Sequence, residues 1–307
     1  MALAQIQNVG ASPRRRPHGR RHTGIAWLFV APFAVLFLVF TAGPVLLSLF
    51  MGFTDIHSAD LQTPFNVNLV GLANYAALFA DPSFLRSILN TLYFVVIGVP
   101  VTMAIGLMLA IILNTGINRL KSVFRVAFYA PVITNIVSVA IIWQYAFNLN
   151  GPINQVLATI GFAGPNWLGD DKLAMPVVIL LGVWHNFGTA MVLFLAGLQT
   201  VPTDVYEAAS LDGAGSWRKL FSITMPLVRP TTLLVSVLIT VFYLQVFDEP
   251  YLLTDGGPLG STQSMALYTY HKFGFGDYGM ASASSYILVI LVSAVSIIQF
   301  RLLRSKE

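Results

Sequence analysis

The sequence predicts an all-α membrane protein with six transmembrane helices and both termini in the cytoplasm. Two features of the composition lead to this fold class: 56% of the 307 residues are hydrophobic, and only 10% are charged. A water-soluble domain usually has about a quarter of its residues charged, because charges cover its surface. With so few charges, the outer surface of this chain is expected to face lipid.

Six stretches are long and apolar enough to cross a hydrocarbon core, which takes about 20 helical residues. Five of them carry no charge, and the fifth in order carries Asp248 and Glu249 near its end. Internal prolines such as Pro100 are tolerated where neighbouring helices satisfy the freed carbonyl groups. The predicted spans are 24–53, 88–113, 126–147, 173–198, 230–253 and 278–300.

Lysine and arginine predict the orientation of these spans. With a cytoplasmic N-terminus, fourteen of the 17 basic residues lie on the inner side, which satisfies the positive-inside rule. The outer loops keep only Arg86, Lys172 and Lys272. The run PRRRPHGRRH is expected to belong to a retained tail and not to a signal peptide, because the next apolar run exceeds an h-region of about 7–15 residues.

The predicted organisation has five parts in chain order. A basic cytoplasmic tail is followed by the first transmembrane helix, an extracytoplasmic loop, a five-helix core that contains one long cytoplasmic loop, and a short cytoplasmic tail. The corresponding ranges are 1–23, 24–53, 54–87, 88–303 with the loop at 199–229, and 304–307.

A polar insert, YEAASLDGAGSWRKLFSITMP (206–226), lies between long apolar runs. Asp204 followed three residues later by Glu207 predicts a helix start of the capping-box kind. Gly213 predicts the end of that helix, because glycine accepts the positive φ of a helix stop. A second short helix is expected next, with Pro226 helping to terminate it. Helices this short are marginal in water, so they are expected to dock on the bundle or on a partner.

The insert resembles the EAA motif of permease subunits from binding-protein-dependent ABC importers. The matching residues are Glu207-Ala208-Ala209, then Gly213 after three residues, Ile223 after nine more, and Met225-Pro226 after one more. The family usually has leucine at the Met225 position, a change that conserves volume. The segments DGAG, YLLTDGGP (251–258) and GDYGMASA (276–283) resemble the carbohydrate branch, as in maltose-type permeases, and the similarity covers roughly 70–303.

The resemblance implies the type I permease fold and a coupling helix that inserts into a cleft of a cytoplasmic ATPase. It implies a first span that wraps a second permease subunit, usually in a heterodimer, together with two ATP-binding subunits and an extracytoplasmic sugar-binding protein. The implied location is a bacterial or archaeal cell (inner) membrane. By resemblance, the ATPase-coupling residues are Glu207, Ala208, Ala209, Asp212, Gly213 and Trp217.

The chain lacks the common signatures of its own chemistry. No glycine precedes any of the five lysines, so there is no P-loop to bind ATP. The hydrolase patterns HExxH and GxSxG are also absent. Without cysteines, the chain has no disulfides, thiolate zinc sites or cysteine nucleophiles. We therefore expect a transport subunit and no enzyme, with no metal, cofactor or nucleic acid of its own; ATP and Mg would bind to the partner ATPase.

Polar side chains inside the spans are the candidates for substrate contact, because a membrane makes them costly. One predicted face of the fifth span combines aromatic and hydrogen-bonding groups, which suit a sugar: Phe242, Gln245, Asp248 and Glu249, with Tyr243 and Phe247 on its edge. Alternatively, the two acids lie in water near the outer interface, where Pro250 bends the helix. The third and fourth spans add residues that interhelical hydrogen bonding explains as well: Gln144, Asn148, His185 and Asn186.

The middle of each predicted span is free of lysine and arginine. A phosphorylated or carboxylated substrate would usually meet a cation or an exposed helix N-terminus, so the sequence favours import of a neutral sugar or oligosaccharide. Two alternatives stay open. One is an ABC permease for glycerol phosphate or another polyol. The other is a proton- or sodium-driven carrier with Asp248 or Glu249 as the titrating group, although no internal repeat is evident.

Overall fold

A computed structural model describes residues 21–62, 67–115 and 120–303 of the chain. The predicted tails therefore lie largely outside the described residues. The regular elements in the described part are helical, and Thr54 and Leu69 form an isolated bridge. Four helices are long and apolar enough to cross a membrane, or up to six if each of two sharply bent helix pairs counts as one span.

The chain divides into two compact units, Met1–Ser48 and Leu49–Glu307. The first unit is built on α1 (Arg21–Phe37) and a π-helical turn, η1 (Leu38–Ala42), and α2 (Gly43–Met51) begins in it. The large apolar side chains along this helical run are exposed. A surface of this kind is suited to lipid or to the apolar face of another helix.

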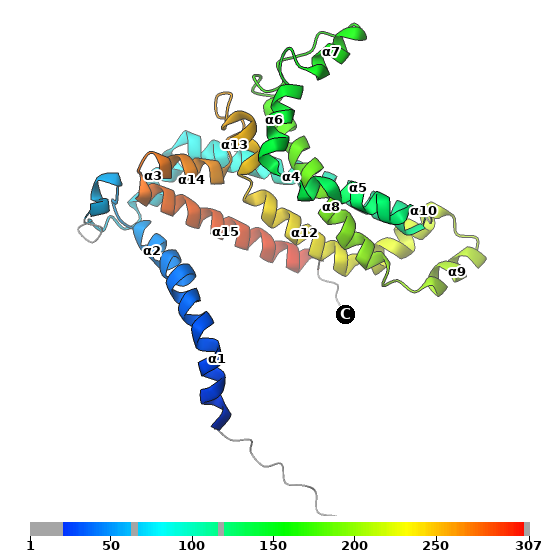
Figure 1. The fold of residues 1–307 in the computed structure, drawn as a ribbon, viewed down its shortest axis with the longest axis horizontal. Coiled ribbons are helices and arrows are strands. Elements are labelled where there is room, and N and C mark those ends of the chain that lie inside the picture. The colour runs from blue at the N-terminus through cyan, green and yellow to red at the C-terminus, as the bar shows by residue number, and fades with distance from the viewer. Residues whose placement is uncertain (1–20, 63–66, 116–119, 304–307) are drawn as a thin grey trace, which may run out of the picture. The chain divides into compact units, whose positions relative to one another are not determined.

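The core of the second unit is formed by α4 (Pro82–Thr115), α8 (Ala174–Leu198), α12 (Arg229–Leu244) and α15 (Tyr278–Leu303), shown in Figure 1. Phe94 faces Gly182, and Gly106 faces Ala190, so α4 and α8 run parallel. Each pair includes a small residue, which lets the two backbones approach closely. The fully buried side chains include Phe94, Phe194 and Ile239.

The third predicted span, 126–147, is two helices and not one. α5 (Lys121–Ile133) and α6 (Ile136–Ala146) meet at 89°. The side chain of Asn135 caps α6 by accepting hydrogen bonds from the backbone N–H groups of Val137 (2.9 Å) and Ser138 (3.3 Å). An Asn cap satisfies helix N–H groups that would otherwise be unpaired, so the second helix can start in a new direction.

The fifth predicted span, 230–253, is also broken, and its predicted single face is wrong. α12 ends at Leu244, and a separate helix, α13 (Asp248–Thr254), follows. Pro250 has no N–H to donate to the Val246 carbonyl four residues earlier. The hydroxyl of Ser264 donates to that carbonyl instead (2.6 Å). The break is therefore stabilised by a neighbouring segment.

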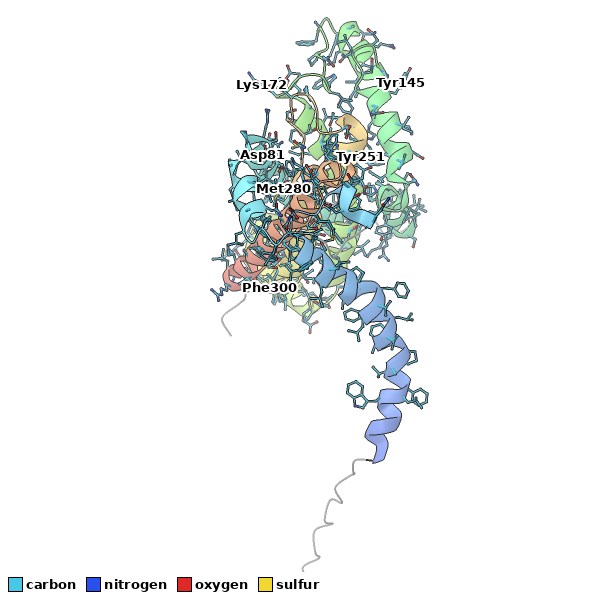
Figure 2. The ribbon with its side chains drawn as sticks, turned by 90° about the vertical axis from the view of Figure 1, so that its left-hand side faces the viewer. Asp81, Tyr145, Lys172, Tyr251, Met280 and Phe300 are labelled. Atoms are coloured by element: carbon cyan, nitrogen blue, oxygen red, sulfur yellow. The ribbon has the colours of Figure 1, made fainter. Side chains whose placement is uncertain are left out.

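Shorter elements cover the end of the unit where α4 begins. These are η2 (Ser58–Gln62), α3 (Ala73–Ala80) and α14 (Met265–Gly274), while α7 (Pro152–Thr159) follows α6. The Tyr268 hydroxyl of α14 donates to the Asp81 carboxylate (2.7 Å). Figure 2 shows Lys172 and Tyr145 toward one end of the second unit and Phe300 toward the other.

Candidate coupling surface and substrate cavity

The polar insert folds into two short helices around a glycine turn, as predicted. α9 (Thr203–Leu211) ends before Gly213, which has a φ of 72°. The backbone N–H of Ala214 bonds to the Ala209 carbonyl (2.9 Å), which closes the helix end. The helix start differs from the prediction: the residue before α9 is Pro202, and Asp204 lies in the first turn without capping it.

The second helix is built from three consecutive segments. α10 (Ser216–Lys219), η3 (Leu220–Thr224) and α11 (Met225–Leu227) follow one another without interruption. The helical segment ends at Leu227, one residue after Pro226, and the chain bends by 72° before α12. Two side-chain hydrogen bonds hold the helices together, from Lys219 Nζ to Ser210 Oγ (2.6 Å) and between the Tyr206 and Thr224 hydroxyls (3.0 Å).

The predicted coupling residues divide by exposure. Ala209 is buried, whereas Glu207, Ala208, Asp212 and Gly213 are exposed. Trp217, the remaining predicted residue, is 75% exposed, and Leu211, which was not predicted, is 90% exposed. The Trp217 ring stacks on Phe221, with centroids 5.9 Å apart. We call the exposed set the coupling surface: Glu207, Ala208, Leu211, Asp212, Gly213, Trp217 and Phe221.

Sequence reasoning did not assign Leu211 or Phe221 to this surface. The four-residue spacing of Trp217 and Phe221 on a helix was the available signal. It also did not foresee a cavity of about 790 Å³ behind the surface. This cavity lies where the ends of α4 and α8 meet α9 and α10, and its lining includes Asn114, Gln199 and Lys219.

Most of the substrate candidates surround a second cavity, of about 380 Å³. The lining comes from the α5 end, the middle of α8, the end of α12 and the break before α13. It contains seven of the nine predicted residues: His185, Asn186, Phe242, Tyr243, Gln245, Asp248 and Glu249, together with Val132, Thr189, Val246 and Phe247. The break brings the two acids to the cavity although they share no helix with Phe242.

Hydrogen bonds hold several of these side chains in place. The buried Tyr243 hydroxyl pairs with Thr102 Oγ1 (2.6 Å), and its ring meets Phe94 edge-on. Asn186 donates to the Gly182 carbonyl (3.0 Å), and Gln245 donates to the Val241 carbonyl (3.2 Å). The cavity wall is therefore partly preorganised before any substrate is bound.

The remaining two candidates, Gln144 and Asn148, do not line this cavity. Gln144 Nε2 donates to the carbonyl oxygens of Leu252 (2.6 Å) and Leu253 (3.2 Å), which ties α6 to α13. Asn148 accepts a hydrogen bond from its neighbour, the Asn150 N–H (3.1 Å). Their place in a substrate path stays a prediction.

The cavity lies halfway along α4. A Cβ at Gly98, near the centre of α4, would stand 2.7 Å from the Tyr243 ring. Two carboxylates line the cavity: Glu249 is buried and Asp248 is exposed. Its described lining includes neither lysine nor arginine. Among the described residues, no group of three or more His, Asp or Glu side chains could hold a metal ion.

A bundle of apolar helices with a cavity halfway along it, lined partly by polar side chains, and an exposed helical turn is typical of a membrane transport subunit. The chain belongs to the family of binding-protein-dependent transport system inner membrane components, whose family model matches residues 69–306. This membership confirms the family expected from the EAA-like residues, and it favours the ABC hypothesis over the stand-alone carrier.

Curated relatives match along almost the whole chain. The lactose transport system permease protein LacF of Rhizobium radiobacter is 34% identical, with 92% of this chain and 94% of that protein covered. The trehalose/maltose transport system permease protein MalF of Thermococcus litoralis is 31% identical, with 94% and 96% covered. The sulfoquinovosyl glycerol transport system permease protein SmoG of Agrobacterium fabrum is 32% identical, with 92% and 91% covered.

A solved structure shares the fold. It is the crystal structure of a bacterial ABC transporter involved in the import of the acidic polysaccharide alginate, with a TM-score of 0.77 and 23% identity. The alignment covers 92% of this chain and 96% of that one. The predicted all-α permease fold of type I ABC importers is thereby confirmed.

Proposed function

We propose that this chain is the membrane-spanning permease subunit of an ATP-driven importer of a neutral sugar or oligosaccharide. The observation that carries the proposal is a pair of sites in one helical unit, the coupling surface and the cavity halfway along α4. They are connected by α12, which starts directly after the coupling segment and ends at the cavity. A helix of 16 residues spans about 24 Å, so it can transmit a movement over that distance.

The side chains of the coupling surface are suited to binding a soluble ATPase subunit. Trp217 and Leu211 expose apolar area that a partner would bury, and Glu207 and Asp212 add charges to the rim. Protein interfaces have this arrangement, with an apolar centre that includes aromatic side chains and a polar edge. The chain would carry no ATPase site of its own, and ATP and Mg would bind to two cytoplasmic partner subunits.

Further partners follow from the family. A second permease subunit would complete the translocation path, and the exposed apolar side chains of α1 offer it a surface to pack on. An extracytoplasmic binding protein would deliver the sugar. In support, the alginate transporter was also solved in complex with an alginate pentasaccharide-bound periplasmic protein. The assembly would reside in the inner membrane of a bacterium or archaeon.

The charge of the cavity favours a neutral substrate. Its described lining offers no lysine or arginine to pair with an anion, and the exposed Asp248 carboxylate would repel an anionic sugar. The relatives include lactose and trehalose/maltose permeases but also a sulfoquinovosyl glycerol permease, and the solved transporter imports an acidic polysaccharide, so the case for a neutral substrate rests on the cavity lining. The lining also weakens the case for a glycerol-phosphate importer, which would need a cation from the second permease subunit.

Coupling can be tested by co-purification. The chain would be expressed with its second permease and a Walker-type ATPase, the bound ATPase would be measured, and ATP hydrolysis would be measured with lactose and the binding protein added. Glu207→Ala removes the carboxylate of the coupling surface. Gly213→Asp places a side chain at a φ of 72°, which strains the turn. Gly213→Asp is expected to lower ATPase retention or hydrolysis about tenfold or more, because the strained turn displaces the whole surface. Glu207→Ala is expected to lower it about twofold to fivefold, because a charge at the rim contributes less.

Asp204→Ala is the matched control, because it removes another exposed carboxylate one turn earlier in α9. This control should retain the ATPase. If no ATPase accompanies the wild-type chain, and uptake instead follows a proton gradient and stops in Asp248→Asn, the proposal is wrong. Faster uptake of a uronate disaccharide than of lactose would refute the neutral-substrate part alone.

A further inference from the structure

Three aromatic rings form a cluster at the edge of the substrate cavity; Phe247 lines the cavity itself, and the other two have no part in the function described so far. The three rings are Phe247 from the break after α12, Tyr251 from α13 and Tyr270 from α14, and we call them the aromatic platform. Their ring centroids lie 5.1 Å apart for Phe247–Tyr251, 5.1 Å for Phe247–Tyr270 and 5.3 Å for Tyr251–Tyr270. Each ring therefore contacts both others at normal aromatic pair distances.

Hydrogen bonds from one side chain fix the backbone segments that carry the aromatic platform. Ser264 bonds to the Val246 carbonyl (2.6 Å), directly before Phe247, and its oxygen also accepts from the Leu267 N–H (3.1 Å) at the start of α14. One side chain thus fixes the break and α14 to each other. The rings that these two segments carry are held in register without any bound molecule.

The aromatic platform leads from the surface to the cavity. Phe247 lines the cavity, whereas Tyr270 is 46% exposed. The Tyr270 end and the Phe247 end of the platform also lie at different positions along α4. Tyr268, two residues from Tyr270, bonds to Asp81 beside the start of α4. The cavity that Phe247 lines lies near Gly98, at the centre of α4. Tyr251, between them in ring contacts, is half-buried. In Figure 2 Tyr251 lies well away from Phe300, on the side toward Lys172.

These rings are not used to fill the core. The two buried hydrophobic clusters of the described residues, and the side chains packed against them, do not include any of the three. A polar edge adjoins them: His271 Nε2 lies 3.0 Å from Asp255 Oδ1, and the His271 ring is 6.1 Å from that of Tyr270. Aromatic faces beside fixed hydrogen-bonding groups match a sugar ring, which offers C–H patches among hydroxyls.

We propose that the aromatic platform is an entry subsite, on which a neutral sugar ring stacks on its way from the binding protein to the cavity. This inference rests on the proposed function, because it supposes that the sugar passes through this chain. Tyr270 would meet the sugar first and Phe247 would pass it on, with the His271–Asp255 pair bonding its hydroxyls. Without the rings, a released sugar would escape before the cavity captured it.

The test uses the complete transporter in proteoliposomes, with its second permease, ATPases and binding protein. Two quantities are measured with lactose: sugar delivered per ATP hydrolysed, and the binding-protein concentration that half-stimulates the ATPase. In Tyr251→Leu and Tyr270→Leu we expect sugar per ATP to fall about threefold to tenfold, the effect of one lost ring contact or slightly more. The binding-protein concentration that half-stimulates the ATPase should stay unchanged.

Variants that keep an aromatic ring at position 270 should keep the wild-type amount of sugar delivered per ATP hydrolysed, which we call the sugar yield. Tyr270→Phe and Tyr270→Trp are expected to deliver sugar per ATP as the wild type does, so they decide the question even if a leucine variant fails to assemble. Tyr145→Leu is the matched control, because Tyr145 is a 69% exposed tyrosine on α6 outside the aromatic platform.

Each other result contradicts the inference in a distinct way. An unchanged sugar yield in both leucine variants means that the sugar does not use the rings, and so does a Tyr270→Trp yield as low as that of Tyr270→Leu. If the leucine variants need a higher binding-protein concentration for half-stimulation but keep the sugar yield, the rings are a docking surface for the binding protein. If the wild type delivers none of lactose, trehalose or maltose, the proposed function fails first and this inference fails with it.

Discussion

At the residue scale, Gly106 marks the closest approach of α4 to α8. A Cβ there would lie 2.6 Å from the Ala190 Cβ and 2.9 Å from the Met191 backbone nitrogen. Because the Met191 nitrogen belongs to the backbone, a side chain can be admitted only by moving one helix. Gly106→Leu is therefore expected to lower the free energy of unfolding by about 1–3 kcal/mol, measured as a lower melting temperature of the detergent-purified chain.

Gly274→Leu is the control for this prediction, because a Cβ at Gly274 would have no atom within 4 Å. Its melting temperature should stay close to that of the wild type. Equal melting temperatures for the two variants would mean that the α4–α8 contact is looser than the structure shows.

Single residues also mark the limit of what the sequence could predict about the site. The aromatic and polar composition of the fifth predicted span identified Tyr243 as a candidate. The Tyr243 hydroxyl, however, pairs with Thr102, which is 141 residues away in the chain. No local pattern reveals such a partner. Conversely, Gly213 was predictable, because a positive φ is a local requirement that glycine meets.

At the element scale, α14 is tied to the segment that starts α4 through Tyr268 and Asp81. Partial burial opposes ionisation of Asp81, but hydrogen bonds from the Tyr268 hydroxyl and the Ser83 N–H, together with the Lys272 charge, outweigh it. The pKa of Asp81 is therefore lowered from its usual value. A lowered pKa in the folded state means that the contact stabilises the fold above the unfolded-state pKa of about 3.9.

This stabilisation should disappear as the pH falls through the folded-state pKa of Asp81. Between pH 5 and about 3, the melting temperature of the wild type is expected to fall more steeply than that of Tyr268→Phe, which lacks the donor. Tyr278→Phe, which removes a hydroxyl at the start of α15, should follow the wild-type curve. Parallel curves for the wild type and Tyr268→Phe would show that this contact does not couple to pH.

The long helices were predictable from the sequence in rough position, but the contacts that stabilise their breaks were not. Apolar length identified the regions of α4, α8 and α15, because lipid exposure is a property of composition. The break after Leu244 depends on Ser264, which satisfies the freed carbonyl of Val246. The bend between α5 and α6 depends on the Asn135 cap. Hydropathy averages over such single contacts, so it reported two continuous spans.

At the scale of the whole molecule, the charges and the fold point to one orientation. α4 and α8 run parallel, with Arg86 and Lys172 near their starts. Lys219, in the segment after α8, lies at the cavity formed where α4 and α8 end. The positive-inside rule therefore predicts that the coupling surface lies in the cytoplasm. The proposed ATPase must bind on this side because ATP is cytoplasmic. ATP-driven import therefore requires this orientation.

The absence of cysteine from the sequence makes this orientation directly testable. Leu211→Cys puts a single thiol on the coupling surface, and Asp171→Cys puts one beside Lys172 in an exposed turn at the opposite end. In intact cells a membrane-impermeant maleimide is expected to label Asp171→Cys and to spare Leu211→Cys, which should react only in inside-out vesicles. Wild-type chain, with no thiol, is the blank. Labelling of Leu211→Cys in intact cells would place the coupling surface outside and remove the physical basis for ATP-driven import.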